Sequence, residues 1–354
     1  MTASSPLAIV TGAPGWLGTR LVETLVSGMA EVPGLEVPLG ERRVRCLCLP
    51  GTDTQVLSAL GAKVEIVEGD LTDPASVKKL CEGATGATVF HCAGIIHPTH
   101  GTRQFTAVNV EGTRRLVQEA EAAGARRMIH VSSNSPVGVN PRPDHVFDEQ
   151  SPYAPYMGYG KSKMRAEEIV NAAGQRAKLE TVIIRPPWFY GPGQPPRQSL
   201  FFEMIRDGKG PIVGGGENRR SMAYIDNICQ GLNLCERVER ARGGTFWIAD
   251  RRPYSMNEII DTVERVMEQD FGVKVAHERM RLPGVISQLA WLADEMLQGL
   301  GLYHQKIHVL SEMNKTIACS IGAAETELGY DPKIELAEGM RRSIGWMFEN
   351  GQTL

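Results

Sequence analysis

The first 190 residues alternate short apolar runs with longer stretches of helical length. The runs are rich in Val, Ile and Leu and show little polar alternation, which is typical of parallel strands covered on both faces. Helix-length stretches such as residues 102–124, which end at a glycine, separate most of them. We therefore predict an α/β fold with a doubly wound parallel sheet. The expected strands are Leu7–Thr11, Val44–Leu49, Lys63–Val67, Ala87–His91, Arg126–Ser132 and Glu180–Arg185.

The regular alternation fades after Gly191, where Pro and Gly punctuate shorter segments. We predict one domain over residues 1–190 and a smaller α/β substrate-binding part over residues 191–354, some of which returns to the main sheet. Residues 30–41 are expected to form an inserted surface loop. The later elements are expected at Ile212–Val213, Met222–Ile225 and Thr245–Ile248 (strands) and at Asn227–Val238, Asn257–Gln269, Val285–Gly299 and Leu336–Asn350 (helices).

Composition narrows the class of protein. The 354 residues carry a net charge of -3, and the cations are scattered, so no basic field indicates nucleic acid. Arg42 and Arg43 are expected at the surface. The seven cysteines show no metal-site spacing and are expected to be reduced, buried thiols. The start of the chain has no secretory pattern and no apolar run reaches about 20 residues, so we expect a cytoplasmic protein without a transmembrane segment.

Three glycines at a spacing of three follow the first strand and open a helix, in the run Thr-Gly-Ala-Pro-Gly-Trp-Leu-Gly from residue 11 to residue 18. This context is typical of the dinucleotide loop of a Rossmann domain. Gly12 allows the tight turn, Gly15 the approach of a pyrophosphate, and Gly18 close packing of helix on strand. The phosphates then lie at the positive helix N-terminus, although Pro14 has no N–H to donate.

Two further strand ends bear on the nucleotide. The second strand ends Cys48-Leu49-Pro50, without the acidic residue typical of NAD sites or the arginine typical of NADP sites, so the choice between the two stays open. At the end of the third strand, Asp70 could accept from the adenine amine while Leu71 packs on the ring. Thr72 or Asp73 could also cap the next helix, which is a compatible role.

Tyr159 and Lys163 are four residues apart at the start of a helical segment and share one face. A nearby ammonium favours the phenolate and brings the tyrosine pKa closer to working pH. Ser133 follows the fifth strand, at the carboxyl edge where open α/β sheets bind ligands. Each feature has an ordinary alternative: a surface tyrosine beside a lysine, and a turn serine before Asn134 and Pro136.

Together, in chain order, these segments resemble the extended short-chain dehydrogenase/reductase superfamily, also described as the NAD-dependent epimerase/dehydratase family. The resemblance covers nearly the whole chain. The matching segments are the glycine loop, Gly69-Asp70-Leu71, His91-Cys92-Ala93-Gly94, Asn109-Val110-Glu111-Gly112-Thr113, Ser132-Ser133, Tyr159 with Lys163, and Arg185 to Pro192.

This resemblance implies an enzyme with an NAD(P)(H) cofactor and assigns roles to residues. Tyr159 would be the proton donor and acceptor, Lys163 would bind the ribose and lower the tyrosine pKa, and Ser133 would hold the reacting oxygen. Asn109 matches the position that supports the active site, and Pro186 would lie near the carboxamide. The expected cofactor-binding residues are Gly12, Pro14, Gly15, Trp16, Leu17, Gly18, Asp70, Leu71, Cys92, Ala93, Gly94, Asn109, Ser132, Tyr159, Lys163 and Pro186.

The segments 218–227 and 324–332 resemble the 3β-hydroxysteroid dehydrogenase-like branch. Trp188 stands where nucleotide-sugar epimerases usually carry asparagine, and Ser133 lacks the following Asp-Glu pair of the dehydratases. The resemblance thus implies interconversion of a secondary alcohol and a ketone on a fairly apolar, steroid- or lipid-like substrate. A nucleotide-sugar epimerase or 4-reductase, with Arg219 or Arg220 on a diphosphate, and a non-catalytic nucleotide sensor are the alternatives. The candidate substrate residues are Ser135, Trp188, Arg219 and Arg220.

Two expectations concern surfaces. Residues 282–303 are apolar on more than one face and could form a lid, a membrane-surface helix or a buried helix of the smaller domain, and we favour the buried helix. Relatives often pair through the helices that match residues 102–124 and 156–173, which implies a homodimer. No metal site is predicted.

Overall fold

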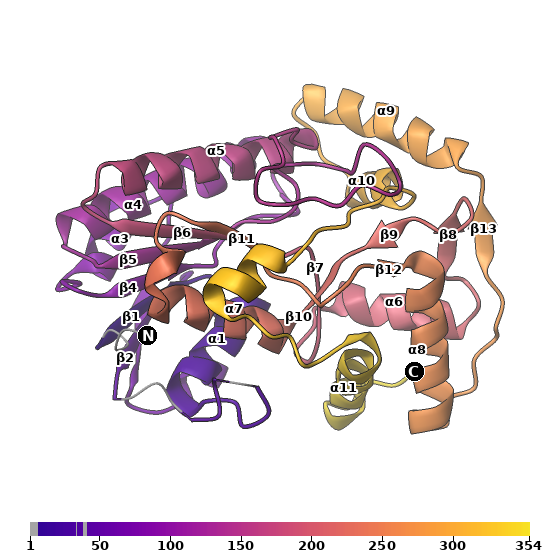
Figure 1. Cartoon of the computed structure of the whole chain (residues 1–354), viewed down its shortest axis with the longest axis horizontal. Helices are drawn as coiled ribbons and strands as arrows, with labels where there is room; N and C mark the ends of the chain where they lie inside the picture. The colour runs from indigo at the N-terminus through magenta and orange to yellow at the C-terminus, as the bar shows by residue number, and fades with distance from the viewer. Residues whose placement is uncertain (1–5, 33, 38–40) are drawn as a thin grey trace.

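Seven parallel strands form the central sheet of the protein, in the order β11-β6-β5-β4-β1-β2-β3 (Figure 1). The computed structural model describes residues 6–32, 34–37 and 41–354. The doubly wound sheet is confirmed, and each of the six strands expected before residue 190 lies within one residue of its predicted bounds. These strands are β1 (Leu7–Thr11), β2 (Arg43–Cys48), β3 (Val64–Glu68), β4 (Thr88–His91), β5 (Arg127–Val131) and β6 (Glu180–Arg185), joined by β11 (Thr245–Trp247).

Two expectations fall partly outside this description. The segment 1–5, which belongs to the start of the chain considered for a secretory pattern, is not among the described residues. The same holds for residues 33 and 38–40 of the expected surface loop.

Helices cover both faces of the sheet, and alternate strand residues pack toward each side. Ile9, Val89 and Met128 face one helical layer, while Val10, Phe90 and Ile129 face the other. Burial on both faces explains why the strands read as continuous apolar runs. The first layer contains α3 (Pro74–Cys81), α4 (Thr113–Ala122) and α5 (Met157–Gln175), and the second contains α1 (Trp16–Ser27) and α7 (Ile225–Arg237).

The helix expected over residues 102–124 divides into two parts. A π-helical segment, η1 (Phe105–Gly112), precedes α4. Leu71 fills the space beside Gly112, where an added Cβ would lie 3.1 Å from the Leu71 Cβ. Because π-helical turns are frequent at functional sites, this departure from the regular pattern draws attention to Asn109 in its middle.

The second half of the chain builds a smaller layer around its own core, which includes Tyr190, Tyr224, Ile259 and Ile344. β11 leaves this region and pairs with β6 of the main sheet. The division at residue 190 stays a prediction. The paired strands are β7 (Trp188–Tyr190) with β10 (Met222–Tyr224), β9 (Arg219–Arg220) with β12 (Tyr254–Ser255), and β8 (Pro211–Val213) with β13 (Met280–Leu282); the helices are α6 (Pro196–Arg206), α8 (Met256–Phe271) and α11 (Leu336–Glu349).

A helical hairpin, α9 (Val285–Gly299) and α10 (Gln305–Glu312), lies at the outer edge of the molecule beyond the start of α5 (Figure 1). The expectation that this segment is a buried core helix is wrong, because Leu292 and Met296 are exposed while Asp294 is buried. The remaining short helices are α2 (Gln55–Ser58), η2 (Glu239–Ala241) and η3 (Ala324–Leu328). Within the described residues, none of the helices has the length and apolarity needed to cross a membrane.

The surface expectation for Arg42 is also wrong. Its side chain is buried and forms two hydrogen bonds to the Glu236 carboxylate on α7, at 2.8 and 2.9 Å. Arg43, its neighbour on β2, is exposed as expected.

Candidate active site

The glycine loop between β1 and α1 is packed too closely for side chains. Gly12 has a φ of +90°, and a Cβ there would lie 2.7 Å from the backbone nitrogen of Ala93. A Cβ on Gly15 would lie 2.7 Å from the carbonyl oxygen of Gly12, which accepts the Gly15 N–H at 3.0 Å. These contacts require glycine and leave the backbone of the loop bare toward a ligand.

The N-terminus of α1 carries no side-chain cap and no acidic residue in its first turn. Its first N–H groups and positive dipole are therefore free to receive an anion. The Trp16 indole N–H donates to the Pro192 carbonyl at 2.7 Å, which fastens this end of the helix to the segment after β7. A dinucleotide diphosphate fits this cradle.

The residues at the end of β3 divide between two tasks. Asp73, rather than Thr72, caps α3 by accepting the N–H groups of Ala75 and Ser76 at 3.2 and 3.0 Å. Asp70 accepts the Thr72 N–H at 2.7 Å through one carboxylate oxygen. Leu71 and Leu17 are buried in the core, so the contact of Leu71 with adenine stays a prediction.

Ser133 and Tyr159 are brought together by β5 and α5. The Ser135 N–H donates to the Ser133 hydroxyl oxygen at 3.0 Å, and the Ser133 side chain lies close enough to the Tyr159 phenol to influence its pKa. Burial raises the pKa of Tyr159 to about 12, and the nearby Ser133 hydroxyl acts in the opposite direction. The free protein therefore holds Tyr159 as a neutral phenol, which can donate a proton.

Lys163 lies one turn further along α5 and is buried. Its ammonium donates to the Val131 carbonyl at 2.7 Å and lies 3.2 Å from His130 Nε2. Because lysine has only donors, His130 must present an unprotonated Nε2 to it. Burial lowers the pKa of Lys163 to about 8, opposed by the charge of Glu167. The lowering of the Tyr159 pKa by Lys163 stays a prediction, since burial has the largest influence on the pKa of that phenol.

Asn109 in η1 ties the loop after β4 to the catalytic helix. Its Oδ1 accepts the Ile95 N–H at 2.8 Å, and its Nδ2 donates to the Ile95 carbonyl at 2.9 Å and to Ser162 Oγ at 3.0 Å. Gly94 lies over this pair, where a Cβ would be 3.5 Å from Asn109 Oδ1 and 4.0 Å from Lys163 Nζ. This arrangement brings Gly94, Asn109 and Lys163 together at one edge of the sheet. Cys92 and Ala93 precede Gly94 in this loop, and burial raises the pKa of Cys92 to about 12.

The carboxyl end of β6 leads into the expected substrate region. Pro186 is buried, and Trp188 on β7 is half-buried with its ring 5.6 Å from that of Phe201. Ser132 is buried, and its hydroxyl has no partner among the described residues. Ser135 is buried and its carbonyl accepts the Tyr156 N–H at 3.1 Å.

The two arginines expected to grip a substrate are bound to backbone carbonyls. Arg219 donates to the carbonyl of Pro143 at 2.7 and 3.1 Å and to that of His145 at 3.2 Å. Arg220 donates to the Glu312 carbonyl at 2.5 Å. Arg219 thus holds the segment of Pro143 and His145, and Arg220 holds the end of α10.

Three residues near Tyr159 belong to no pattern that sequence reasoning used. The Phe105 ring lies 6.1 Å from that of Tyr159, and the Tyr303 ring lies 6.0 Å from that of Phe105. The positive charge of Arg197, at the start of α6, lowers the pKa of both Tyr159 and Tyr303, although burial outweighs it in each case. Arg197 is exposed and forms no hydrogen bond or ion pair within the described part of the chain. Only the tertiary structure brings these segments together.

Gln298 of α9 caps the start of the catalytic helix, which has no side-chain cap of its own. It accepts the Gly158 N–H at 2.9 Å and donates to Asp294 at 3.0 Å. The other oxygen of Asp294 lies 2.7 Å from His308 Nδ1 on α10. The hairpin therefore positions the turn that carries Tyr159.

Comparisons with known proteins agree with this geometry. The model of the NAD dependent epimerase/dehydratase family matches residues 8–264. The chain is 51% identical to an uncharacterized protein, y4nL, of Sinorhizobium fredii over 100% of this chain and 98% of that protein. It is 26% identical to 3β-hydroxysteroid-dehydrogenase/decarboxylase isoform 1 of Arabidopsis thaliana over 97% of this chain and 80% of that protein. It is 29% identical to a 4-hydroxy-2-methyl-3-oxo-4-farnesyl-3,4-dihydroquinoline-1-oxide ketoreductase of Stigmatella aurantiaca over 94% and 93% of the two chains.

Solved structures share the fold. The crystal structure of gox2253 superposes with a TM-score of 0.77 at 23% identity, covering 99% of this chain and 100% of that one. A dTDP-glucose 4,6-dehydratase of Streptomyces venezuelae, with NAD and TYD bound, gives a TM-score of 0.74 at 24% identity and 97% coverage of both chains. The fold and the site thus define an enzyme of the extended short-chain dehydrogenase/reductase type with a nicotinamide cofactor. The chain belongs to the NAD-dependent epimerase/dehydratase family.

Proposed function

We propose that this enzyme is an NAD(P)-dependent oxidoreductase that interconverts a secondary alcohol and a ketone on a fairly apolar substrate. The observation that carries the proposal is the proximity of Ser133 to the Tyr159 phenol, which lies one helical turn from the buried Lys163. All three lie at the carboxyl edge of the sheet, beside the bare loop of Gly12 and Gly15.

Each residue of this set has a task that its chemistry suits. The bound nicotinamide would supply the hydride for reduction or accept it in oxidation. Ser133 and Tyr159 would hold the reacting oxygen between two hydroxyls, and Tyr159 would give its proton to that oxygen as the ketone becomes the alcohol. In the oxidation the same phenol oxygen takes the proton back. Lys163 would hold the nicotinamide ribose with the N–H groups left over from its bonds to β5.

The surroundings of Tyr159 support an apolar substrate. Phe105 packs against Tyr159, Tyr303 packs against Phe105, and Trp188 adds an aromatic ring at the carboxyl end of β6. The guanidinium groups of Arg219 and Arg220 donate hydrogen bonds to backbone carbonyls, which argues against their binding a diphosphate. The hydroxysteroid dehydrogenase and ketoreductase names of two relatives point the same way.

A nucleotide-sugar epimerase or 4-reductase is the second candidate, and Arg197 is the observation that favours it. Its guanidinium is unpaired among the described residues, and its charge influences Tyr159 and Tyr303. Such a cation could bind a phosphate or a carboxylate of the substrate. A solved structural neighbour that carries NAD and TYD also supports this candidate.

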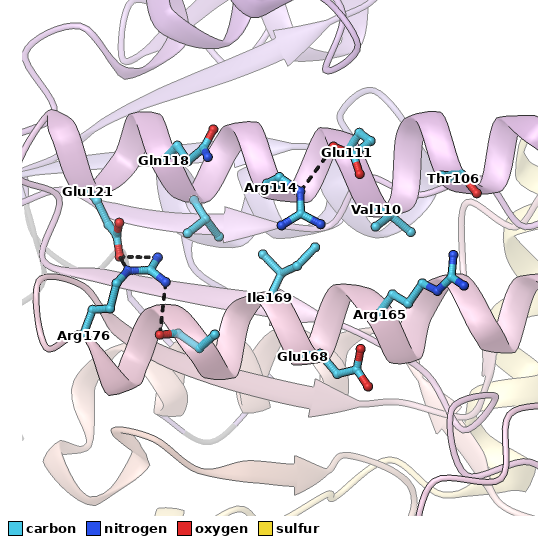
Figure 2. Close-up of a pocket in the computed structure, with 12 residues that line it drawn as sticks. Thr106, Val110, Glu111, Arg114, Gln118, Glu121, Arg165, Glu168, Ile169 and Arg176 are labelled. Carbon is cyan, nitrogen blue, oxygen red and sulfur yellow. Dashed lines mark hydrogen bonds and ion pairs between the residues drawn. The ribbon is translucent and has the colours of Figure 1, made fainter.

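We also propose a homodimer formed through η1, α4 and α5. Figure 2 shows the groove between these helices, with Ile169 at its centre and the Arg176–Glu121 ion pair at one end. The groove has a volume of about 760 Å³. A second copy of the same helix pair would fill such a groove in a four-helix arrangement, because a two-fold interface is self-complementary.

The experiment that tests the function is a fluorescence titration of the purified enzyme with NADH and NADPH. It is repeated with a panel of UDP-sugars and sterol-like ketones, each also assayed for turnover. The oxidoreductase proposal expects binding of a reduced nucleotide and its oxidation only with apolar ketones. Binding and turnover of a UDP-sugar would instead establish the second candidate. Nucleotide binding without any turnover, unchanged in Tyr159→Phe, would favour a sensor.

A further inference from the structure

Helix α9 buries polar side chains and exposes large apolar ones, which is the reverse of the usual pattern for a helix at the surface of a globular protein. Ser287 and Asp294 are fully buried on its inner side, whereas apolar residues face outward. We call the outward residues the α9 stripe; they are between 54% and 76% exposed and comprise Val285, Leu289, Leu292, Met296, Leu300 and Leu302. Helical spacing places the first five on one face. An exposed apolar face of this length marks an interaction site on a soluble fold.

Polar contacts hold the helix in this orientation. Ser287 Oγ donates to the Ser311 carbonyl at 2.8 Å and lies 2.7 Å from Asn314 Oδ1. Asp294 pairs with His308 on α10 at 2.7 Å. Turning the helix to hide its leucines would break these buried bonds and leave Asp294 without its partner, which is costly. These buried polar contacts therefore fix α9 in the orientation that exposes its apolar face.

Four cations lie on segments that adjoin the α9 stripe. Arg281 precedes α9 on β13, Lys306 follows it on α10, and the Lys315 ammonium lies 4.9 Å from the Trp291 ring centre. Arg103 adjoins Thr102, whose N–H donates to the Gly301 carbonyl at 3.0 Å. None of these four cations forms an ion pair in the described residues.

Acidic side chains are scarce in the segment that carries the α9 stripe. Over residues 281–306, all of them described, Glu295 is the only exposed acidic side chain. An apolar stripe with a basic border is complementary to an anionic lipid surface, where leucines enter the acyl boundary and cations meet the headgroups.

We propose that α9 docks this enzyme on an anionic membrane surface. A second copy of the chain is the less suitable occupant, because the basic border would face itself across a two-fold axis. The end of the α9 stripe also leads toward the active site, since Tyr303 follows Leu302 and its ring packs on Phe105 beside Tyr159. Docking in this way holds the site close to the lipid. This inference goes beyond the proposed reaction and does not depend on it.

The test is co-sedimentation of the full chain with vesicles, without any turnover. Vesicles of phosphatidylcholine alone are compared with vesicles containing a third of phosphatidylglycerol, at low and at high salt. The test variant carries Leu289→Gln, Leu292→Gln and Met296→Gln. The control variant carries Val37→Gln, Val56→Gln and Val146→Gln, which replace exposed valines elsewhere. NADH binding is measured for every variant to verify folding.

The proposal expects wild type to bind the anionic vesicles and to lose binding as salt rises. The stripe variant should bind at least about tenfold more weakly, because three apolar side chains no longer enter the lipid, while the control binds as wild type. Replacing Arg281 and Lys306 by Gln should weaken binding roughly fivefold for each charge removed.

Two results would overturn the proposal. One is a wild type that stays in the supernatant, or that binds no better than a folded stripe variant. The other is a stripe variant whose oligomeric state falls in light scattering while vesicle binding is unchanged, which would assign the face to a second copy.

Discussion

Helices α5 and α9 meet at one edge of the molecule, and both direct polar side chains inward. Their outer faces differ in character. Helix α5 buries Lys163 and Glu167, and its outer face is a groove lined by charged and polar residues around Ile169. Helix α9 buries Asp294, and its outer face is the α9 stripe. In α5, Glu167 pairs with Arg185 and Lys163 is proposed to hold the cofactor, whereas in α9 Asp294 pairs with His308 and fixes the orientation of the helix. A buried carboxylate therefore does not by itself mark chemistry; what it is bonded to decides its role.

Replacing Tyr159 by Phe should have the largest effect, because it removes the proposed proton donor at the reacting oxygen. We expect kcat to fall by about 10²- to 10⁴-fold, the usual contribution of a positioned acid, with NADH affinity unchanged. Tyr153→Phe is the matched control, since the Tyr153 hydroxyl donates to Glu167 and Tyr153 is not among the proposed catalytic residues. Steady-state kinetics on a substrate found by the panel measures both. Equal loss in the two variants would remove Tyr159 from its proposed role.

The next effect is on stability and concerns the buried pair of Glu167 and Arg185, which are 2.7 Å apart. Glu167→Gln leaves the Arg185 charge buried without a counter-charge, so the free energy of unfolding should fall by about 3 kcal/mol or more. Urea unfolding measures this. Arg142→Ala, which breaks an exposed pair with Asp144, should change it by less than about 1 kcal/mol. A similar change in the free energy of unfolding for the two variants would contradict the expected contribution of the buried pair to stability.

The pKa of Lys163, about 8, predicts a change within the ordinary pH range. NADH binding should weaken above about pH 8, as the ammonium that would hold the ribose loses its proton. The sign for stability is opposite: between pH 8 and the ordinary lysine value the unfolded chain binds more protons, so this group's contribution to stability rises with pH. Fluorescence titrations between pH 6.5 and 9.5 (roughly the lysine window) test the binding. Lys161→Met, on the exposed side of α5, should leave the profile unchanged, and a flat wild-type profile would exclude this role for Lys163.

The smallest expected effect concerns Gln298, the residue through which α9 binds the start of α5. Gln298→Ala removes the acceptor for the Gly158 N–H, so the free energy of unfolding should fall by about 1 kcal/mol. Because the first turn of α5 carries Tyr159, kcat should fall several-fold, by the same order of free energy, while the KM for the nucleotide stays constant. Gln288→Ala, at an exposed position on α9, is the control. A fall in stability with kcat unchanged would make Gln298 a structural residue only.

Much of the sheet and of the site could be predicted because the information is local in the chain. Apolar runs of strand length, glycines at a spacing of three and a tyrosine four residues before a lysine depend on neighbouring residues only. The six expected strands came within one residue of their observed bounds, and Ser133 lies near the Tyr159 phenol, as their positions at a strand end and a helix start suggested.

What could not be predicted depends on partners distant in the chain. Arg42 looked like a surface cation until α7 supplied Glu236, which is 194 residues away. Arg197, Phe105 and Tyr303 come from three separate segments, and no short pattern joins them.

The α9 segment shows the division between sequence and tertiary structure most clearly. The sequence by itself determined that residues 285–299 form a helix with too many apolar residues for one ordinary face. Only the tertiary structure decided which face is hidden, because the polar atoms of Ser287, Asp294 and Gln298 find their partners on α10 and α5. A buried polar group without a partner costs more than an exposed leucine loses, so the hydrogen bonds set the orientation and left the leucines outside.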